Sequence, residues 1–216
     1  EDDSQFALSE AQQAAFDSIQ ENFKTFDVNL LHGVTASGKT EIYIKLLEQY
    51  IKEGKQVLFL LPEIALTTQL VQRLTAYFGN EVAVFHSKYT NNERIEVWNQ
   101  VLENSPKAKV VIGVRSALFL PFSNLGCIIV DEEHEQTFKQ HDPAPRYHAR
   151  DAAIVLAKQH GAKVVLGSAT PSLETYYNVQ SNKYGLTELK VRYGNVVLPE
   201  IQLVDLKDKY FRKKMS

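Results

Sequence analysis

The segment 33–40 constrains this chain more than any other part of its sequence. It fits the pattern G-x-x-x-x-G-K-[ST], in which a loop curls around a phosphate group and offers it a row of backbone N–H groups. The two glycines permit the unusual dihedral angles and close backbone approach that such a loop needs. The lysine supplies a positive charge for the β- and γ-phosphates, and the final hydroxyl is a Mg²⁺ ligand. The predicted nucleotide-binding residues are Gly33, Val34, Thr35, Ala36, Ser37, Gly38, Lys39 and Thr40.

Short apolar runs alternate with helical patterns on both sides of this loop. Residues 28–32 are typical of a buried strand, and apolar residues at helical spacing predict a helix over 40–52. The same patterns predict further strands at 56–61, 81–85, 109–114, 127–130 and 163–166, with weaker signals at 186–191 and 201–204. Further helices are predicted at 9–24, 64–78, 91–102 and 148–160. This alternation predicts a three-layer α/β/α domain with a mainly parallel sheet.

The spacing of apolar residues also predicts which helix faces are buried. In the helix at 91–102, Ile95, Trp98 and Leu102 recur at helical spacing. We therefore expect these three side chains to face the core.

The strand at 127–130 runs directly into consecutive carboxylates. Hydrophobic residues followed by Asp131 and Glu132 indicate the second half of a nucleotide site, where the first carboxylate holds Mg²⁺ and the second acts as general base on the attacking water. The strand at 163–166 leads similarly into a G-S-A-T-P-S segment. Ligands of parallel sheets bind beyond the carboxyl ends of the strands, so we expect all these residues to cluster at one sheet edge.

Composition excludes several classes of protein. The 216 residues are 44% hydrophobic and 23% charged, with a formal net charge of −2, so any nucleic-acid site must be a local patch. The single cysteine, Cys127, lies in an apolar run and is predicted to be buried. It allows no internal disulfide and no cysteine zinc cluster, and it suits the reducing cytoplasm. No apolar run approaches a membrane span and no signal peptide is recognised. The start at Glu1 rather than methionine indicates a fragment or a processed product.

Taken together, these motifs resemble the first RecA-like lobe of superfamily 2 helicases. More narrowly, they resemble the family of primosomal replication-restart helicases, the PriA family (primosomal protein N′). The matching segments are P-E-I-A-L-T at 62–67, G-V-R-S-A-L-F at 113–119, D-E-E-H at 131–134, P-R-Y-H-A-R-D at 145–151 and G-S-A-T-P-S at 167–172. The resemblance covers about residues 8–205, and D-E-E-H followed by P-R-Y-H-A-R-D is specific to the family. Ala36 stands where many relatives have glycine, a position that the loop pattern leaves free.

The resemblance implies roles for individual residues. Gln12 would contact the adenine edge, with Gln13 as the alternative if the register differs, and Gln12 also completes an S-x-x-Q capping box with Ser9. The residues implied to couple nucleotide state to DNA are His134, Gly167, Ser168, Thr170, Phe138, Arg146 and Tyr147. The residues implied to touch the single-strand backbone are Glu63, Thr67, Thr68, Arg115 and Ser116.

The loop at 136–150 is predicted to switch ATP hydrolysis on when DNA binds. Its aromatic residues Phe138 and Tyr147 would offer faces on which a base could stack. Lys139, Arg146 and Arg150 have Asp142 as the only local counter-charge, so a phosphate could compete for them. Composition alone favours a surface loop whose aromatics pack on the domain and whose arginines make ion pairs. The resemblance favours the switch instead, because related helicases carry an aromatic-rich loop here that senses single strands.

The function implied by the resemblance is that of an ATP-dependent 3′-to-5′ DNA helicase motor lobe. It would act in primosome assembly and replication restart, on single-stranded and branched fork DNA, with other primosome proteins and single-strand-binding protein as partners. ATP and Mg²⁺ are the expected cofactors, and zinc is expected only in a part of the family that this chain lacks. We expect residues 1–206 to form the lobe and 207–216 a polar tail toward a second lobe, and the lobe alone to be weakly active. The alternatives are another superfamily 2 translocase or a nucleotide-gated interaction module without turnover.

Overall fold

The computed structural model describes residues 7–34, 37–63, 69–86 and 89–190. Its helices are α1 (Glu10–Asn22), α2 (Lys39–Lys52), α3 (Gln69–Phe78), α4 (Asn91–Leu102), α5 (Ala149–His160) and α6 (Leu173–Gln180). Its strands are β1 (Val28–Gly33), β2 (Gln56–Leu60), β3 (Val82–Phe85), β4 (Val110–Gly113), β5 (Leu125–Asp131), β6 (Lys163–Ser168) and β7 (Gly185–Leu189). Short 3₁₀ turns lie at Gly79–Glu81, Pro106–Ala108, Arg115–Phe119 and Gln136–Phe138.

The strands form a seven-stranded sheet in the order β3-β4-β2-β5-β6-β1-β7, and all its pairings are parallel. Central strands such as β2 are buried along their whole length, which explains their continuous apolar sequence. The register pairs Asp131 with Gly167 and His32 with Ser168, so the carboxyl ends of β5, β6 and β1 lie side by side. The predicted α/β class and parallel sheet are therefore confirmed.

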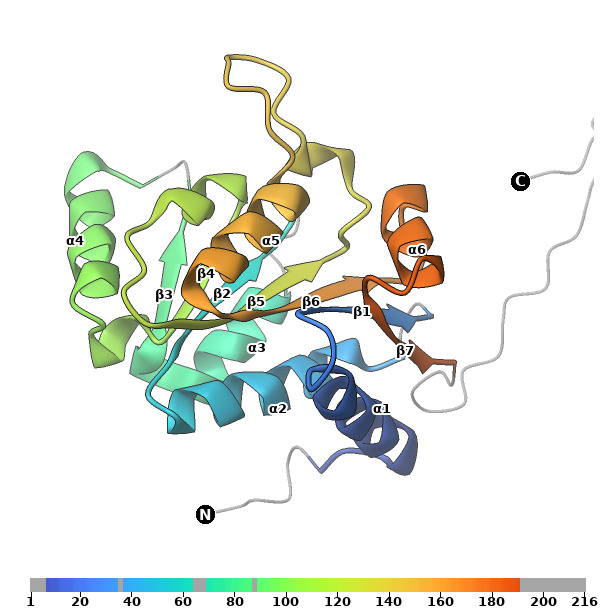
Figure 1. Ribbon diagram of the computed structural model, residues 1–216. Coiled ribbons are helices and arrows are strands. Elements are labelled where there is room, and N and C mark those ends of the chain that lie inside the picture. Colours follow the sequence, from blue (N-terminus) through green and yellow to red (C-terminus); the bar gives the residue numbers. More distant parts are fainter. Residues whose placement is uncertain (1–6, 35–36, 64–68, 87–88, 191–216) are drawn as a thin grey trace, which may run out of the picture.

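Helices cover both faces of the sheet (Figure 1). Side chains of α1, α2 and α3 build one apolar core, and side chains of α4 and α5 build the other on the opposite face. The helix α6 lies on the same side as α5 (Figure 1), and its Val179 packs against that second core. This arrangement confirms the predicted three layers. No described helix is long and apolar enough to cross a membrane.

The prediction of which face of α4 is buried was wrong. In α4 the side chains of Ile95, Trp98 and Leu102 are 58%, 46% and 51% exposed, whereas Val97 and Val101 are buried. The helix carries two apolar stripes at helical spacing, and it lies on the sheet by the valine stripe. The helix α6 was not predicted, although Ser172 caps its start by accepting a hydrogen bond from the Thr175 backbone N–H at 3.3 Å. Residues 64–68 of the predicted third helix and the weak strand at 201–204 lie outside the described residues.

Candidate nucleotide-binding and coupling site

The phosphate loop joins the end of β1 to the first turn of α2. Gly38 is the N-cap of α2 with a left-handed φ of 83°, and it leaves the helix N-terminus without a side-chain cap. The Lys39 Nζ lies 3.1 Å from the Gly33 carbonyl oxygen, so the ammonium is held over the loop. Ser37 Oγ is buried and has no hydrogen-bond partner among the described residues. An uncapped helix N-terminus, a folded-back lysine and an unpaired hydroxyl are the donor set that a phosphate needs.

Space restricts both glycines of this loop, and the left-handed φ adds a conformational requirement at Gly38 alone; Gly33 ends strand β1 without a positive φ. A Cβ at Gly33 would lie 2.7 Å from Ser37 Oγ, and a Cβ at Gly38 would overlap the amide of Gln12. Thr40 lies partly buried in the first turn of α2, whereas Thr35 and Ala36 lie outside the described residues.

Gln12 connects helix α1 to the phosphate loop. Its Oε1 accepts the Ser9 backbone N–H at 2.8 Å, which completes the predicted capping box, and its Nε2 donates to the Gly38 carbonyl at 3.1 Å. Gln13 is exposed and instead donates to Asp17 at 2.8 Å. Of the two glutamines, only Gln12 therefore lies at the loop, and its contact with adenine stays a prediction.

Asp131 ends β5 beside the hydroxyl of Tyr43, a fully buried residue of α2. Tyr43 Oη donates to Asp131 Oδ1 at 2.8 Å. Removal from water and the neighbouring Glu132 raise the pKa of Asp131 to about 6, while Tyr43 and Lys39 act in the opposite direction. Removal from water and the adjoining Asp131 also raise the pKa of Tyr43, so its hydroxyl remains a donor. The site therefore holds one carboxyl that ionises near neutral pH within the field of Lys39.

Glu132 follows in a strained backbone conformation. Its φ is 51°, in the left-handed region that non-glycine residues seldom occupy. Its Oε2 lies 3.7 Å from the Nδ1 of His134. A carboxylate held in this way at the end of a buried strand can serve as a general base, which is the predicted role of Glu132.

His134 connects this segment to the end of β6. Its Nδ1 lies 2.8 Å from Ser168 Oγ, and its Nε2 lies 3.4 Å from Thr170 Oγ1. The Thr170 backbone N–H also donates to Ser168 Oγ at 3.0 Å. Three predicted coupling residues therefore share one hydrogen-bonded cluster, whereas their role in coupling stays a prediction.

Sequence reasoning missed the third carboxylate of D-E-E-H. Glu133 is fully buried and pairs with Arg150, whose NH1 lies 3.1 Å from Glu133 Oε2. Arg150 also pairs with Asp151 at 2.9 Å. The expectation that Asp142 is the only local counter-charge of Arg150 was therefore wrong, because Arg150 pairs with the adjacent Asp151 and with Glu133.

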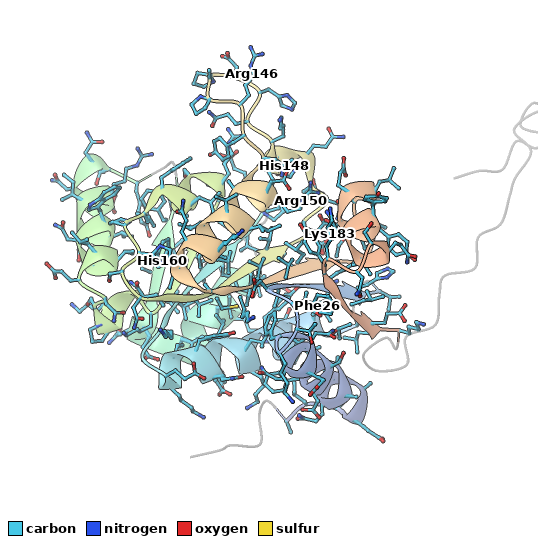
Figure 2. All side chains as sticks on the ribbon, viewed as in Figure 1. Phe26, Arg146, His148, Arg150, His160 and Lys183 are labelled. Atoms are coloured by element: carbon cyan, nitrogen blue, oxygen red, sulfur yellow. The ribbon has the colours of Figure 1, made fainter. Side chains whose placement is uncertain are left out.

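The loop at 136–150 projects from the body of the domain (Figure 1). Its neck is closed by an antiparallel bridge between Lys139 and His148, and the Arg115 NH1 donates to the carbonyls of Thr137 and Lys139, each at 3.2 Å. Figure 2 shows Arg146 at the projecting tip, with His148 and Arg150 at the base. The loop therefore stands on a hydrogen-bonded base, and its tip is exposed.

The two aromatic residues of this loop differ in exposure. Phe138 is 1% exposed and belongs to the core, so the prediction that it offers a face for base stacking was wrong. Tyr147 is partly buried and meets Phe119 edge to face at 5.3 Å between ring centroids. Phe119 itself is 59% exposed, so this pair keeps an aromatic surface open to solvent.

A pocket of about 210 Å³ lies at the base of the loop. Among its lining residues are Glu63, Arg94, Arg115, Ser116 and Tyr147. Three residues that were predicted to contact DNA thus meet at one depression, while Thr67 and Thr68 lie outside the described residues.

Comparisons with known proteins agree on one family. The DEAD/DEAH box helicase family model matches residues 9–179. The chain is 46% identical over 203 residues to the replication restart protein PriA of Bacillus subtilis (strain 168), and the match covers 93% of this chain and 25% of that protein. It is 47% identical over 214 residues to the replication restart protein PriA of Haemophilus influenzae, and the match covers 99% and 29%. The chain thus spans about a quarter of the length of the curated relatives it matches.

Solved structures show the same fold at lower identity. RecG bound to a three-way DNA junction aligns with a TM-score of 0.61 at 22% identity, covering 85% of this chain and 24% of that one. The DUF1998 helicase MrfA bound to DNA and AMPPNP aligns with a TM-score of 0.59 at 20% identity, covering 86% and 27%.

Proposed function

Because the chain belongs to the DEAD/DEAH box helicase family, we propose that it is the ATP-binding motor lobe of a 3′-to-5′ DNA helicase that restarts stalled replication forks. The observation that carries the proposal is the meeting of the phosphate loop and the carboxylates at one sheet edge. Lys39 lies close enough to Asp131 to favour its ionised form, although 92 positions (131 − 39) separate them. The relatives that share 46–47% identity are replication restart proteins, which supports the choice of this helicase class.

ATP and Mg²⁺ fit the residues at this edge. The uncapped N-terminus of α2 and Ser37 Oγ would receive the phosphates, Lys39 would neutralise their charge, and Thr40 and Asp131 would hold the metal. Bound Mg²⁺ supplies charge for the transition state. Glu132 would take a proton from the water that attacks the γ-phosphate. The part of the chain that the structure describes contains no group of three or more His, Cys, Asp or Glu that could hold a metal. Zinc in the longer proteins of the family stays an expectation from the resemblance.

Single-stranded DNA is proposed to cross the loop side of the domain. The pocket beside Arg115 and Ser116 offers a guanidinium and a hydroxyl, groups that bind phosphate oxygens without reading sequence. Tyr147 and Phe119 present an aromatic surface next to it, which suits base stacking. The Arg115 guanidinium also holds the carbonyls of Thr137 and Lys139, so a phosphate that draws Arg115 away would loosen the neck of the loop.

The partners and location follow from the proposed helicase class. We propose that the protein works in the cytoplasm on branched fork DNA, together with other primosome proteins and single-strand-binding protein. The low net charge of −2 fits a protein whose DNA contacts are confined to a local surface.

ATP turnover with and without single-stranded DNA is the test. We expect the chain alone to bind nucleotide and hydrolyse it slowly, because an arginine finger from a second lobe is worth ~10³ to 10⁵ in rate in related systems. A fusion of this chain to the second lobe that the family resemblance implies should restore DNA-stimulated turnover. Nucleotide binding without turnover in the fusion would instead indicate a nucleotide-gated interaction module, and full stimulation of the chain alone would contradict the requirement for a second lobe.

A further inference from the structure

The carboxylate of Glu133 receives four hydrogen bonds in the interior. Arg150 NH1, Ser172 Oγ and Thr175 Oγ1 lie 3.1, 3.0 and 2.8 Å from its Oε2, and the Ser172 backbone N–H donates to its Oε1 at 2.7 Å. The Glu133 side chain is 0% exposed and the Arg150 side chain 7%. Both oxygens are thus satisfied and the buried charge is paired, which is the condition for keeping an ion in a protein interior.

Stability alone does not account for such a pair. Removing two charges from water is expensive, and apolar residues of similar volume usually stabilise a core as well or better. The surrounding core in fact offers apolar neighbours, because Ala149 and Ala153 of the same helix are buried in it. The place of the ion pair in the fold must therefore explain why it is kept.

The position is next to the proposed general base. Glu132 lies between two anchored residues, because Asp131 is held by Tyr43 and the Glu133 backbone N–H donates to the Gly167 carbonyl at 3.1 Å. A strained φ such as the 51° of Glu132 persists only where the surrounding structure over-determines it. The buried side chain of Glu133 supplies that constraint on the C-terminal side.

The Glu133 carboxylate also connects two segments that contact other parts of the molecule. Arg150 lies in the first turn of α5, where its backbone N–H donates to Nδ1 of His148 at 3.3 Å, and His148 bridges to Lys139 at the neck of the projecting loop. Ser172 is the N-cap of α6 and follows the segment that contacts His134. The neck of the loop, the start of α6 and the backbone of Glu132 therefore meet at Glu133.

We propose that Glu133 and Arg150 are positioning residues that hold Glu132 in its left-handed conformation and transmit movements of the loop neck to it. The proposal rests on the proposed ATPase function, and it assigns a role to the residue of D-E-E-H that neither holds the metal nor accepts the proton. Glu133 acts only through the backbone it shares with Glu132.

The test compares turnover, nucleotide affinity and stability in matched variants of the fusion to the second lobe. Glu133→Gln keeps the side-chain shape but directs an amide N–H group or an uncharged oxygen at Arg150. We expect maximal DNA-stimulated turnover to fall at least tenfold while KM for ATP and the Kd for ADP stay within twofold, at a temperature where circular dichroism shows the variant folded. Thr175→Val removes one donor without changing charge and should lower turnover about threefold with the same unchanged affinity.

Asp151→Asn is the control, because it removes only the partner of Arg150 whose side chain is 63% exposed, and turnover should stay within twofold. The double variant Glu133→Gln, Arg150→Gln removes the unpaired buried charge. We expect it to recover thermal stability while turnover stays low, because neutral amides do not reproduce the carboxylate that gathers four donors. If Glu133→Gln does not fold, the double variant and Thr175→Val test the proposal in its place.

Three results would overturn the inference. They are full turnover in folded Glu133→Gln, equal losses in Asp151→Asn and Glu133→Gln, and a double variant whose turnover returns with its stability. Absence of turnover in the unmutated fusion would refute the proposed function instead, so the two failures are distinguishable.

Discussion

Replacing Gly167 by alanine should disturb the carboxyl of Asp131, the proposed metal ligand, although the two residues are far apart in sequence. Gly167 lies beside Asp131 in the sheet, and a Cβ added to it would overlap the hydroxyl of Tyr43. The same Cβ would lie 3.0 Å from Tyr43 Cζ and 3.1 Å from Asp131 Oδ1. Tyr43 is fully buried, so its ring cannot swing into solvent to make room.

The expected loss of stability has two parts. Overpacking a well-filled core costs roughly 1–3 kcal/mol. Displacing Tyr43 from Asp131 also weakens a hydrogen bond to a charged group, which contributes about 1.5–3 kcal/mol. We therefore expect Gly167→Ala to lower the free energy of unfolding by roughly 2.5–6 kcal/mol, measured by urea unfolding, where each kcal/mol corresponds to about 2–4 °C in Tm for a chain of this size.

The variant Tyr43→Phe identifies the cause. It removes the hydroxyl with which the new methyl group collides, so the two substitutions should not be additive. The double variant should be more stable than the sum of the single losses predicts, by about 1–3 kcal/mol, a normal coupling energy for residues in contact. Additive losses, or a Gly167→Ala variant as stable as the original, would refute the packing argument.

The remaining predictions concern the nucleotide and the loop. Lys39→Ala should weaken nucleotide binding by roughly 2–5 kcal/mol in calorimetric titrations. Glu132→Gln should keep the nucleotide affinity and lower turnover by about 10² to 10⁴. If both variants lost the same affinity, the role of Glu132 as general base would be contradicted. Because the pKa of Asp131 is raised from 3.8 to about 6, Mg²⁺-dependent nucleotide binding should tighten as pH rises through 6. Metal-free stability should fall as pH rises from 3.8 to about 6, where the unfolded state has lost this proton and the folded state still holds it, and Asp131→Asn should abolish both trends. Arg146→Ala should reduce the stimulation of turnover by single-stranded DNA more than it reduces DNA-independent turnover, and it should change the free energy of unfolding by less than about 0.5 kcal/mol. Unchanged stimulation in this variant would show that the tip of the loop does not contact DNA. Phe138→Ala should instead cost about 3–5 kcal/mol of stability, because that ring is in the core.

The sequence was sufficient for the sheet and the phosphate loop because their signals are local. A buried parallel strand reads as an unbroken apolar run, and β2 and β5 have that pattern. The loop at 33–40 is defined by spacing alone, and once the strands are known to be parallel, Asp131 and Gly167 must lie at the same edge. Those predictions needed no knowledge of which helix packs where.

Predictions that depend on helix orientation were less secure. In α4 the stripe of Ile95, Trp98 and Leu102 and the stripe of Val97 and Val101 both satisfy helical spacing, so periodicity cannot decide which one is buried. The decision lies in how the helix rolls onto the sheet, which depends on the neighbouring elements rather than on the helix itself. The prediction that Phe138 offers a face for base stacking was wrong for a related reason. An aromatic residue in a loop segment still packs into the core when its backbone lies against the domain.

The buried Glu133 marks the limit of reading a motif one residue at a time. In sequence it follows two carboxylates with assigned roles, and nothing local separates it from a solvated strand end. Its donors come from positions 150, 172 and 175, so the pairing exists only after α5 and α6 have packed against the end of β5. A fully buried carboxylate without these donors would be strongly destabilising, so the four groups must be kept or changed together. The P-R-Y-H-A-R-D and G-S-A-T-P-S segments are therefore connected physically to D-E-E-H through one side chain, and a substitution at any of the three should be judged by its effect on the other two.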